Sequence, residues 1–146
     1  MRNARINWSI QEYSWPFEEE LRNEWLIRIS GEHGKQLRRL NVNLLTDEEL
    51  IELNRDHLDH DTYTDIITFD YSINKGLEGE IFISYDRVEE NAAKENVANN
   101  QELMRVIAHG LLHLCGLKDK LESEKLEMRE AEENALKLWL EVSRGT

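Results

Sequence analysis

The chain has 146 residues, of which 40% are hydrophobic and 33% are charged, and its formal net charge is −12. This length suits one ordinary domain, so we expect a single domain over residues 1–146. The composition is too apolar for a disordered chain, and no apolar run approaches the roughly 18 residues that a membrane span requires. The acidic excess disfavours a general nucleic-acid binder, because such affinity comes largely from Lys and Arg meeting phosphates, so any RNA contact has to be local.

The chain contains a single cysteine, Cys115, which rules out an internal disulfide. Its first ten residues contain no apolar core of a signal peptide. Together these features predict a cytoplasmic protein.

The first third of the chain alternates strand and helix patterns. Residues 5–10 predict a short strand, and Pro16 lies where the first turn of a helix is expected, because its missing N–H costs nothing there. This helix is expected to end at residues 31–34 and to have one apolar face, made by Phe17, Leu21, Trp25 and Ile29. Residues 37–45 predict a second strand.

A capping box opens the next helix. Thr46 is its cap, Glu49 follows three residues later, and the helix is expected to run to about Asp56. Its apolar residues, Leu50, Ile51 and Leu53, are predicted to be buried. A polar loop follows with a second cluster of His and Asp, whose spacing fits no familiar metal site; its members are His57, Asp59, His60 and Asp61.

The middle of the chain predicts a hairpin and a helix. Residues 65–71 are rich in Ile, Thr, Phe and Tyr, residues 72–79 predict a turn, and residues 80–84 predict the partner strand. Ser84 is the expected N-cap of a helix over residues 86–96.

Two further helices complete the expected fold. Asn99 or Asn100 is the predicted N-cap of a core helix whose apolar residues are Leu103, Val106, Ile107, Leu111 and Leu114. The last helix is expected over residues 123–142, with five residues facing inward: Leu126, Ala131, Leu136, Trp139 and Leu140. The sequence therefore predicts an α+β fold, in which one small mixed β-sheet packs with about five helices.

The core helix carries the most informative motif of the chain. His109 and His113 are four residues apart, so both imidazoles lie on one helix face and can reach one metal ion. Gly116 is the natural helix stop, beyond which the chain can fold back and bring Asp119 to the same ion. A lone histidine in an apolar helix is more often a satisfied core residue, but this spacing, H-x3-H-x2-G-x2-(H/D), matches that of metzincin-like zinc helices. It predicts a metal site with an open coordination position.

One position departs from the protease pattern. In H-E-x-x-H the residue after the first histidine is the glutamate that acts as general base, and here that residue is Gly110. Peptide hydrolysis is therefore disfavoured, whereas a metal at this site can still polarise a phosphoryl oxygen and acidify a bound water.

Residues 53–55 with 64–69, residues 79–84 and residues 109–116 occur in this order along the chain, and together they make it resemble the YbeY family of bacterial rRNA-maturation endoribonucleases. Leu53-Asn54-Arg55 with Thr64-Asp65-Ile66-Ile67-Thr68-Phe69 is similar to the family's LNxxYRGxDxPTDVLSF. Residues 79–84 are similar to its GDIxIS strand, and residues 109–116 to its HGxLHLxGYDH. The resemblance covers almost the whole length in the order of elements.

The chain departs from the family pattern at three positions. Asp119 stands where the family usually has a third histidine, and an Asp is an acceptable zinc ligand. Leu58 stands where the family typically has an arginine thought to act on the substrate phosphate. Arg55, three residues earlier, is either its substitute or an exposed helix arginine. Tyr63 replaces a proline.

The resemblance implies a zinc-dependent endoribonuclease for single-stranded RNA that matures rRNA ends, especially of the small subunit, and serves ribosome quality control. One Zn²⁺ per chain is expected on His109, His113 and Asp119, with rRNA and the small subunit or its proteins as partners. The expected catalytic groups are Arg55 and the metal-bound water, and the expected substrate-binding residues are Thr64, Asp65, Lys118 and Lys120. Two alternatives stay open: a metalloprotease-like hydrolase, and a non-catalytic ribosome-assembly factor with a structural zinc, which would need a fourth ligand such as His57 or His60.

Overall fold

A mixed four-stranded sheet organises the described part of the molecule. The computed structural model describes residues 4–10, 14–58, 65–74 and 76–144. The strands lie side by side in the order β1-β2-β4-β3, with bounds β1 (Arg5–Ile10), β2 (Gln36–Leu45), β3 (Ile66–Asp70) and β4 (Gly76–Ser84). β1 pairs parallel with β2 and β2 parallel with β4, whereas β3 pairs antiparallel with β4. The predicted mixed sheet and its hairpin are confirmed.

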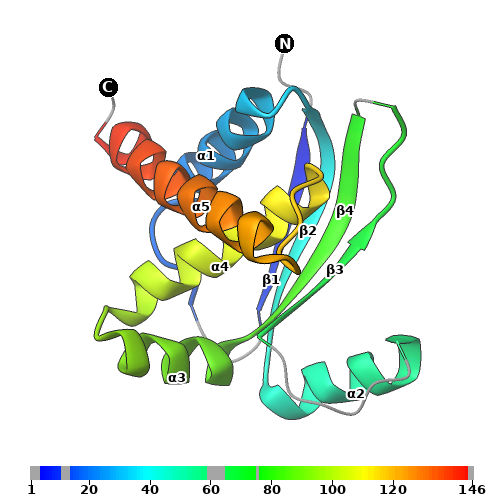
Figure 1. Cartoon of the computed structure of the whole chain (residues 1–146), viewed down its shortest axis with the longest axis vertical. Coiled ribbons are helices and arrows are strands. Elements are labelled where there is room, and N and C mark those ends of the chain that lie inside the picture. Colours follow the sequence, from blue (N-terminus) through cyan, green and yellow to red (C-terminus); the bar gives the residue numbers. More distant parts are fainter. Residues whose placement is uncertain (1–3, 11–13, 59–64, 75, 145–146) are drawn as a thin grey trace.

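Five helices accompany this sheet in the described residues. Their bounds are α1 (Glu19–Glu32), α2 (Asp47–Leu58), α3 (Tyr85–Glu95), α4 (Asn99–Leu114) and α5 (Glu122–Ser143). Figure 1 shows α4 packed on one face of the sheet, with α1 and α5 on that same side and α2 near one end of the sheet. The α+β architecture is therefore confirmed, and no helix in the described ranges combines the length and apolar character needed to cross a membrane.

The α4 helix is the centre of the hydrophobic core. All five apolar residues predicted to face inward are at most 4% exposed: Leu103, Val106, Ile107, Leu111 and Leu114. The helix contacts the sheet through β3 and β4, and it also contacts α1, α3 and α5. Because most of its circumference is covered, the two histidines that remain partly exposed mark its one open side.

The predicted helix ends are confirmed where side chains or glycine define them. Thr46 Oγ1 accepts from the Glu49 N–H at 3.2 Å while Glu49 Oε1 accepts from the Thr46 N–H at 2.9 Å, which completes the capping box of α2. Ser84 Oγ accepts from the Arg87 N–H at 3.2 Å and so caps α3.

Gly116 ends α4 as the sequence predicted. It has a φ of 109° in the left-handed region, and its N–H donates to the His113 carbonyl while the Leu117 N–H donates to the Leu112 carbonyl. This pair of bonds is the Schellman motif, which turns the chain sharply away from the helix axis.

Two predicted helix starts were wrong. The first helix begins at Glu19 rather than near Pro16, because Phe17 has a φ of 65°, and the Arg22 guanidinium closes this turn by donating to the carbonyls of Pro16 and Phe17. The helix α4 has Ala98 as its N-cap, with no capping side chain, so neither Asn99 nor Asn100 has that role.

The inward face of α5 also differs from the prediction. Leu126 and Leu140 are 72% and 49% exposed. The buried residues of α5 instead recur every three or four positions, and they are Met128, Glu132, Ala135, Leu138, Trp139 and Val142.

The turn before β4 is shorter than the predicted residues 72–79, because Gly76 already pairs with Gln36 of β2. In α2, Leu50 is buried, and Ile51 and Leu53 are partly buried.

At Gly110, α4 lies close against the sheet. A Cβ atom at this position would lie 2.7 Å from Ile66 Cδ1 and 3.1 Å from two atoms of Ile81. The residue after His109 therefore faces the sheet, and the glycine lets the helix that carries both histidines lie against it.

We expect Gly110→Ala to lower the free energy of unfolding by about 1–3 kcal/mol, the usual cost of adding atoms to a packed core. Gly31→Ala is the matched control, since a Cβ at this position of α1 meets nothing within 4 Å. That control should stabilise the helix by roughly 0.5–1 kcal/mol. Chemical denaturation of both variants measures the difference, and equal stabilities would show that α4 does not press on the sheet at Gly110.

Cys115 offers a test of burial at the end of α4. Its side chain lies in the core cluster, and burial raises the pKa of its thiol to about 11. A raised folded-state pKa means that the proton stabilises the fold below the unfolded pKa, and that this contribution is lost as the pH rises toward the folded value. We expect the native thiol to resist iodoacetamide at about pH 8 and to react readily in denaturant; rapid native labelling would contradict this burial.

Candidate metal centre

Two histidines of α4 form one edge of the site. His109 and His113 lie one helical turn apart, their ring centroids are 4.7 Å from each other, and their side chains are 18% and 29% exposed. They therefore share the open side of an otherwise buried helix, as their spacing predicted.

The turn at Gly116 brings Asp119 back to these histidines. Asp119 Oδ2 lies 3.3 Å from His109 Nε2 and 3.4 Å from His113 Nε2. Zinc bonds of about 2.0–2.2 Å at tetrahedral angles would place neighbouring ligand atoms about 3.3–3.6 Å apart. The two separations from Asp119 match this spacing, and all three ligand atoms lie within 4.8 Å of one another, so these side chains form the one group in the described ranges that could hold a metal ion.

A buried glutamate supports the first histidine. Glu132 of α5 is 2% exposed, and its Oε2 lies 2.5 Å from His109 Nδ1. Burial alone would raise the pKa of this carboxyl, but its hydrogen bonds to His109 and Arg105 lower the pKa below its usual value. The carboxylate is therefore ionised and accepts a hydrogen bond from Nδ1–H of His109, which directs Nε2 toward Asp119 as the nitrogen that a metal would bind.

Arg105 continues this network into the helix interface. Its Nη1 donates to Glu132 Oε1 at 2.7 Å, and its Nε and Nη2 donate to the two carboxylate oxygens of Glu102 at 3.0 and 2.5 Å.

The carboxylates around His109 favour a positive charge at the site. Burial alone would lower the pKa of His109, yet Glu132, Asp119 and Asp65 together raise this pKa above its usual value. The same carboxylates that favour a protonated imidazole would favour a bound cation.

Glu132 was not predicted as a site residue, because it lies 23 residues from His109 in the chain. A signal was nevertheless present. Glu132 follows Met128 by four residues and precedes Ala135 by three, so it occupies an inward position in an apolar stripe. A carboxylate at such a position needs a buried partner.

Asp65 is the predicted substrate-contacting residue that the structure brings to this site. It lines a pocket of about 350 Å³ together with His109 and Asp119. Burial raises the pKa of its carboxyl, although His109 and Arg105 act in the opposite direction. Its Oδ2 accepts a long hydrogen bond of 3.4 Å from Asn91.

The other predicted contacts lie outside this pocket or outside the described residues. Arg55 lies in α2 with an exposed side chain, and Lys118 and Lys120 are exposed on either side of Asp119, but none of these three lines the pocket. Their roles stay predictions. Thr64 and Tyr63 fall outside the described residues, as do the side chains of Leu58 and of the second cluster: His57, Asp59, His60 and Asp61.

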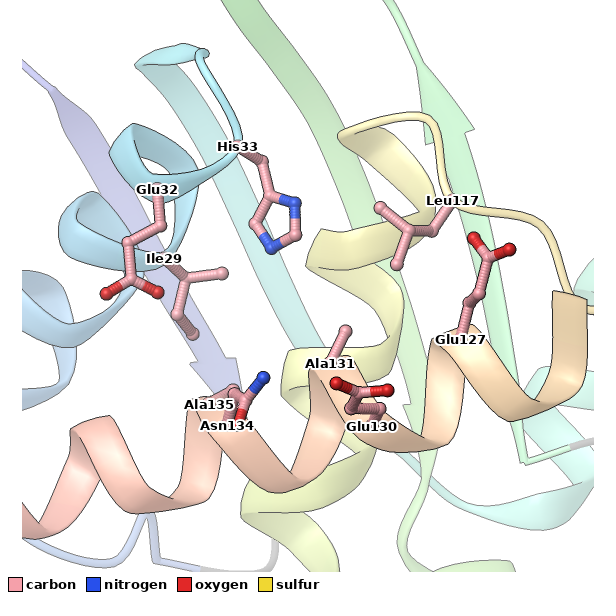
Figure 2. Close-up of a pocket in the computed structure, with 9 residues that line it drawn as sticks. All are labelled: Ile29, Glu32, His33, Leu117, Glu127, Glu130, Ala131, Asn134 and Ala135. Atoms are coloured by element: carbon pink, nitrogen blue, oxygen red, sulfur yellow. The ribbon is translucent and has the colours of Figure 1, made fainter.

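A second hollow, of about 500 Å³, lies where α1, α5 and the chain after α4 meet (Figure 2). Three carboxylates, those of Glu32, Glu127 and Glu130, surround apolar side chains that include Ile29 and Leu117. It has no converging set of metal ligands among the described residues, so the pocket beside His109 is the candidate reactive site.

Glu132→Gln should weaken zinc binding about 10- to 100-fold, because it removes the negative charge that orients and polarises His109. Glu133→Gln is the matched control, since it removes the same charge from an exposed neighbour on the same helix. Competition with a chromogenic chelator measures both affinities, with circular dichroism to confirm folding. Equal affinities in the two variants would exclude a supporting role for Glu132.

Comparison with known proteins shows the family to which the chain belongs. The family model for endoribonuclease YbeY matches residues 9–139. The chain is 46% identical to endoribonuclease YbeY of Bacteroides thetaiotaomicron over 77% of its length and 82% of that protein, and 51% identical to endoribonuclease YbeY of Cytophaga hutchinsonii over 78% and 80%. Its fold is similar to the solution structure of TM1509 from Thermotoga maritima, with a TM-score of 0.67, 28% identity, and coverage of 96% of this chain and 92% of the other. This chain belongs to the YbeY family of endoribonucleases.

Proposed function

We propose that this protein is a zinc-dependent endoribonuclease that cleaves single-stranded RNA. The observation that carries the proposal is the convergence of His109, His113 and Asp119 beside a pocket, with Glu132 buried behind the first of them. Membership of an endoribonuclease family supplies the substrate class.

In this proposal the three ligands hold one Zn²⁺. When bound, the ion supplies Lewis-acid polarisation of a phosphodiester oxygen and lowers the pKa of a coordinated water. Glu132 keeps the Nδ1 proton of His109 in place and so keeps Nε2 available. Of the three carboxyls that line the pocket, Asp119 and Glu132 are engaged with the histidines, which leaves Asp65 to meet the substrate.

The wider role follows from the family. We propose that residues 1–146 form one catalytic domain in the cytoplasm, that its substrates are rRNA ends, especially of the small subunit, and that its partners are rRNA and the small subunit or its proteins. Ribosome quality control belongs to the same proposal. Arg55, Thr64, Lys118 and Lys120 are proposed to contact the RNA.

The packing of Gly110 supports phosphodiester over peptide hydrolysis. The position that carries the general base in H-E-x-x-H points at Ile66 and Ile81 in this chain, so a glutamate there would meet the sheet. Cleavage of a peptide library without cleavage of RNA would reverse this assignment.

We expect wild type to contain about one zinc per chain and to cleave single-stranded RNA. Asp119→Ala should lose both the metal and the cleavage. Asp119→His, which restores the third histidine usual in the family, should retain both. Elemental mass spectrometry and RNA cleavage on the same samples measure the two properties, with Glu133→Ala as a control for the loss of one carboxylate.

Three outcomes separate the possibilities in this experiment. Zinc retained in Asp119→Ala would remove Asp119 from the ligand set. Zinc in wild type without RNA cleavage would favour the ribosome-assembly factor with a structural zinc. Loss of zinc from Glu133→Ala as well would show that the metal responds to net charge and not to a defined site.

A further inference from the structure

Positive charge gathers beside the candidate metal site in a chain that is otherwise strongly acidic. The pocket next to His109 is lined by three cations, Arg105, Lys125 and Arg129, which balance its three carboxylates. The chain as a whole has 18 basic and 30 acidic residues. An RNA strand that approaches this pocket therefore meets cations that offset the local carboxylates, before any metal adds its own charge.

One face of α5 carries two of these cations toward the site. Lys125, Arg129 and Glu132 are separated by four and three residues, so they lie along the same side of the helix. Glu132 is at the buried end of this row, where it contacts His109. Lys125 and Arg129 line the same pocket and are 57% and 52% exposed, so they lie where the pocket meets solvent.

These two cations are only loosely paired within the protein. Lys125 Nζ lies 3.7 Å from the fully solvated Glu122 carboxylate. The Arg129 guanidinium lies 3.5 Å from Glu95 and 3.8 Å from Glu132. The pairs with Glu122 and Glu95 are exposed and long and therefore contribute little, so exchanging these two pairs for a phosphate costs little.

Arg105 has a different role in the same pocket. Its side chain is 20% exposed, and its contacts with Glu102 and Glu132 are 2.5 to 3.0 Å long. These hydrogen bonds raise the pKa of its guanidinium above the usual value, although burial alone would lower that pKa. Arg105 is therefore committed to holding Glu132, and the two cations with freedom to bind a ligand are Lys125 and Arg129.

We propose that Lys125 and Arg129 bind the RNA backbone and position a phosphate next to the His109–His113–Asp119 site. The inference rests on the proposed nuclease function and adds the residues that bind its substrate.

The test measures RNA binding apart from cleavage. Zinc-loaded protein is titrated into a fluorescein-labelled, 2′-O-methyl single-stranded RNA, and anisotropy gives Kd over a range of salt concentrations. The test variant is Lys125→Gln/Arg129→Gln. The matched control is Lys94→Gln/Lys137→Gln, which removes the same total charge from exposed positions of α3 and α5 outside the pocket.

We expect Kd to rise about 20-fold in the test variant at about 0.1 M salt, and the salt slope to fall by about 1.4, because each contact to a single strand contributes about 0.7. The control should stay within about two-fold of wild type, as the loss of distant screened charges predicts. Equal Kd values and slopes in the two double variants would overturn the inference.

Two further measurements keep this result separate from other failures. Because Arg129 lies near Glu132, zinc content is measured for each variant; if it falls in the double variant, Lys125→Gln alone decides, with an expected rise in Kd of about five-fold. Cleavage of unmodified RNA by wild type is assayed in parallel. If wild type does not cleave, the proposed function fails, while the binding data still decide the role of Lys125 and Arg129.

Discussion

The hydrogen bond between His109 and the buried carboxylate of Glu132 is the interaction on which the site depends. It joins α4, which carries two candidate ligands, to α5, which packs against α4. A buried carboxylate without partners would be costly, and here His109 on one oxygen and Arg105 on the other offset that cost. Arg105 is held in turn by Glu102. The orientation of one imidazole is thus built into the packing of two helices, and it does not rest on a flexible surface contact.

The metal-site motif could be predicted from sequence because its geometry is local. His109, His113, Gly116 and Asp119 lie within one helix end and its turn, where the i, i+4 relation and the left-handed glycine determine which groups meet. Glu132 and Asp65 could not be placed in the same way. Their proximity to His109 depends on how α5 and the start of β3 dock on α4, and no periodicity in the sequence encodes that distance.

The fold shows the same division between local and tertiary control. The core helix, the capping box at Thr46 and the Ser84 cap were predicted correctly because each follows from hydrogen bonds or spacing within a few residues. The start of α1 was wrong because Arg22 reaches back and closes the turn at Phe17. Leu126 and Leu140 were wrongly assigned to the inward face of α5 because they are apolar. The face that the helix buries includes Glu132, a residue that hydrophobicity alone would place in solvent.

The position of the candidate ligands along the chain has a thermodynamic consequence. All three ligands lie within eleven residues, so an unfolded chain already holds them close together, whereas Glu132 reaches His109 only after α5 has docked. A metal that binds the unfolded chain as well as the native one adds nothing to the stability of the fold. If the site holds zinc as proposed, the groups that tertiary packing adds, Glu132 among them, contribute to the preference of the metal for the native protein. By thermodynamic linkage, the free energy that Glu132 adds to metal binding equals the free energy by which a bound metal stabilises the docking of α5 on α4.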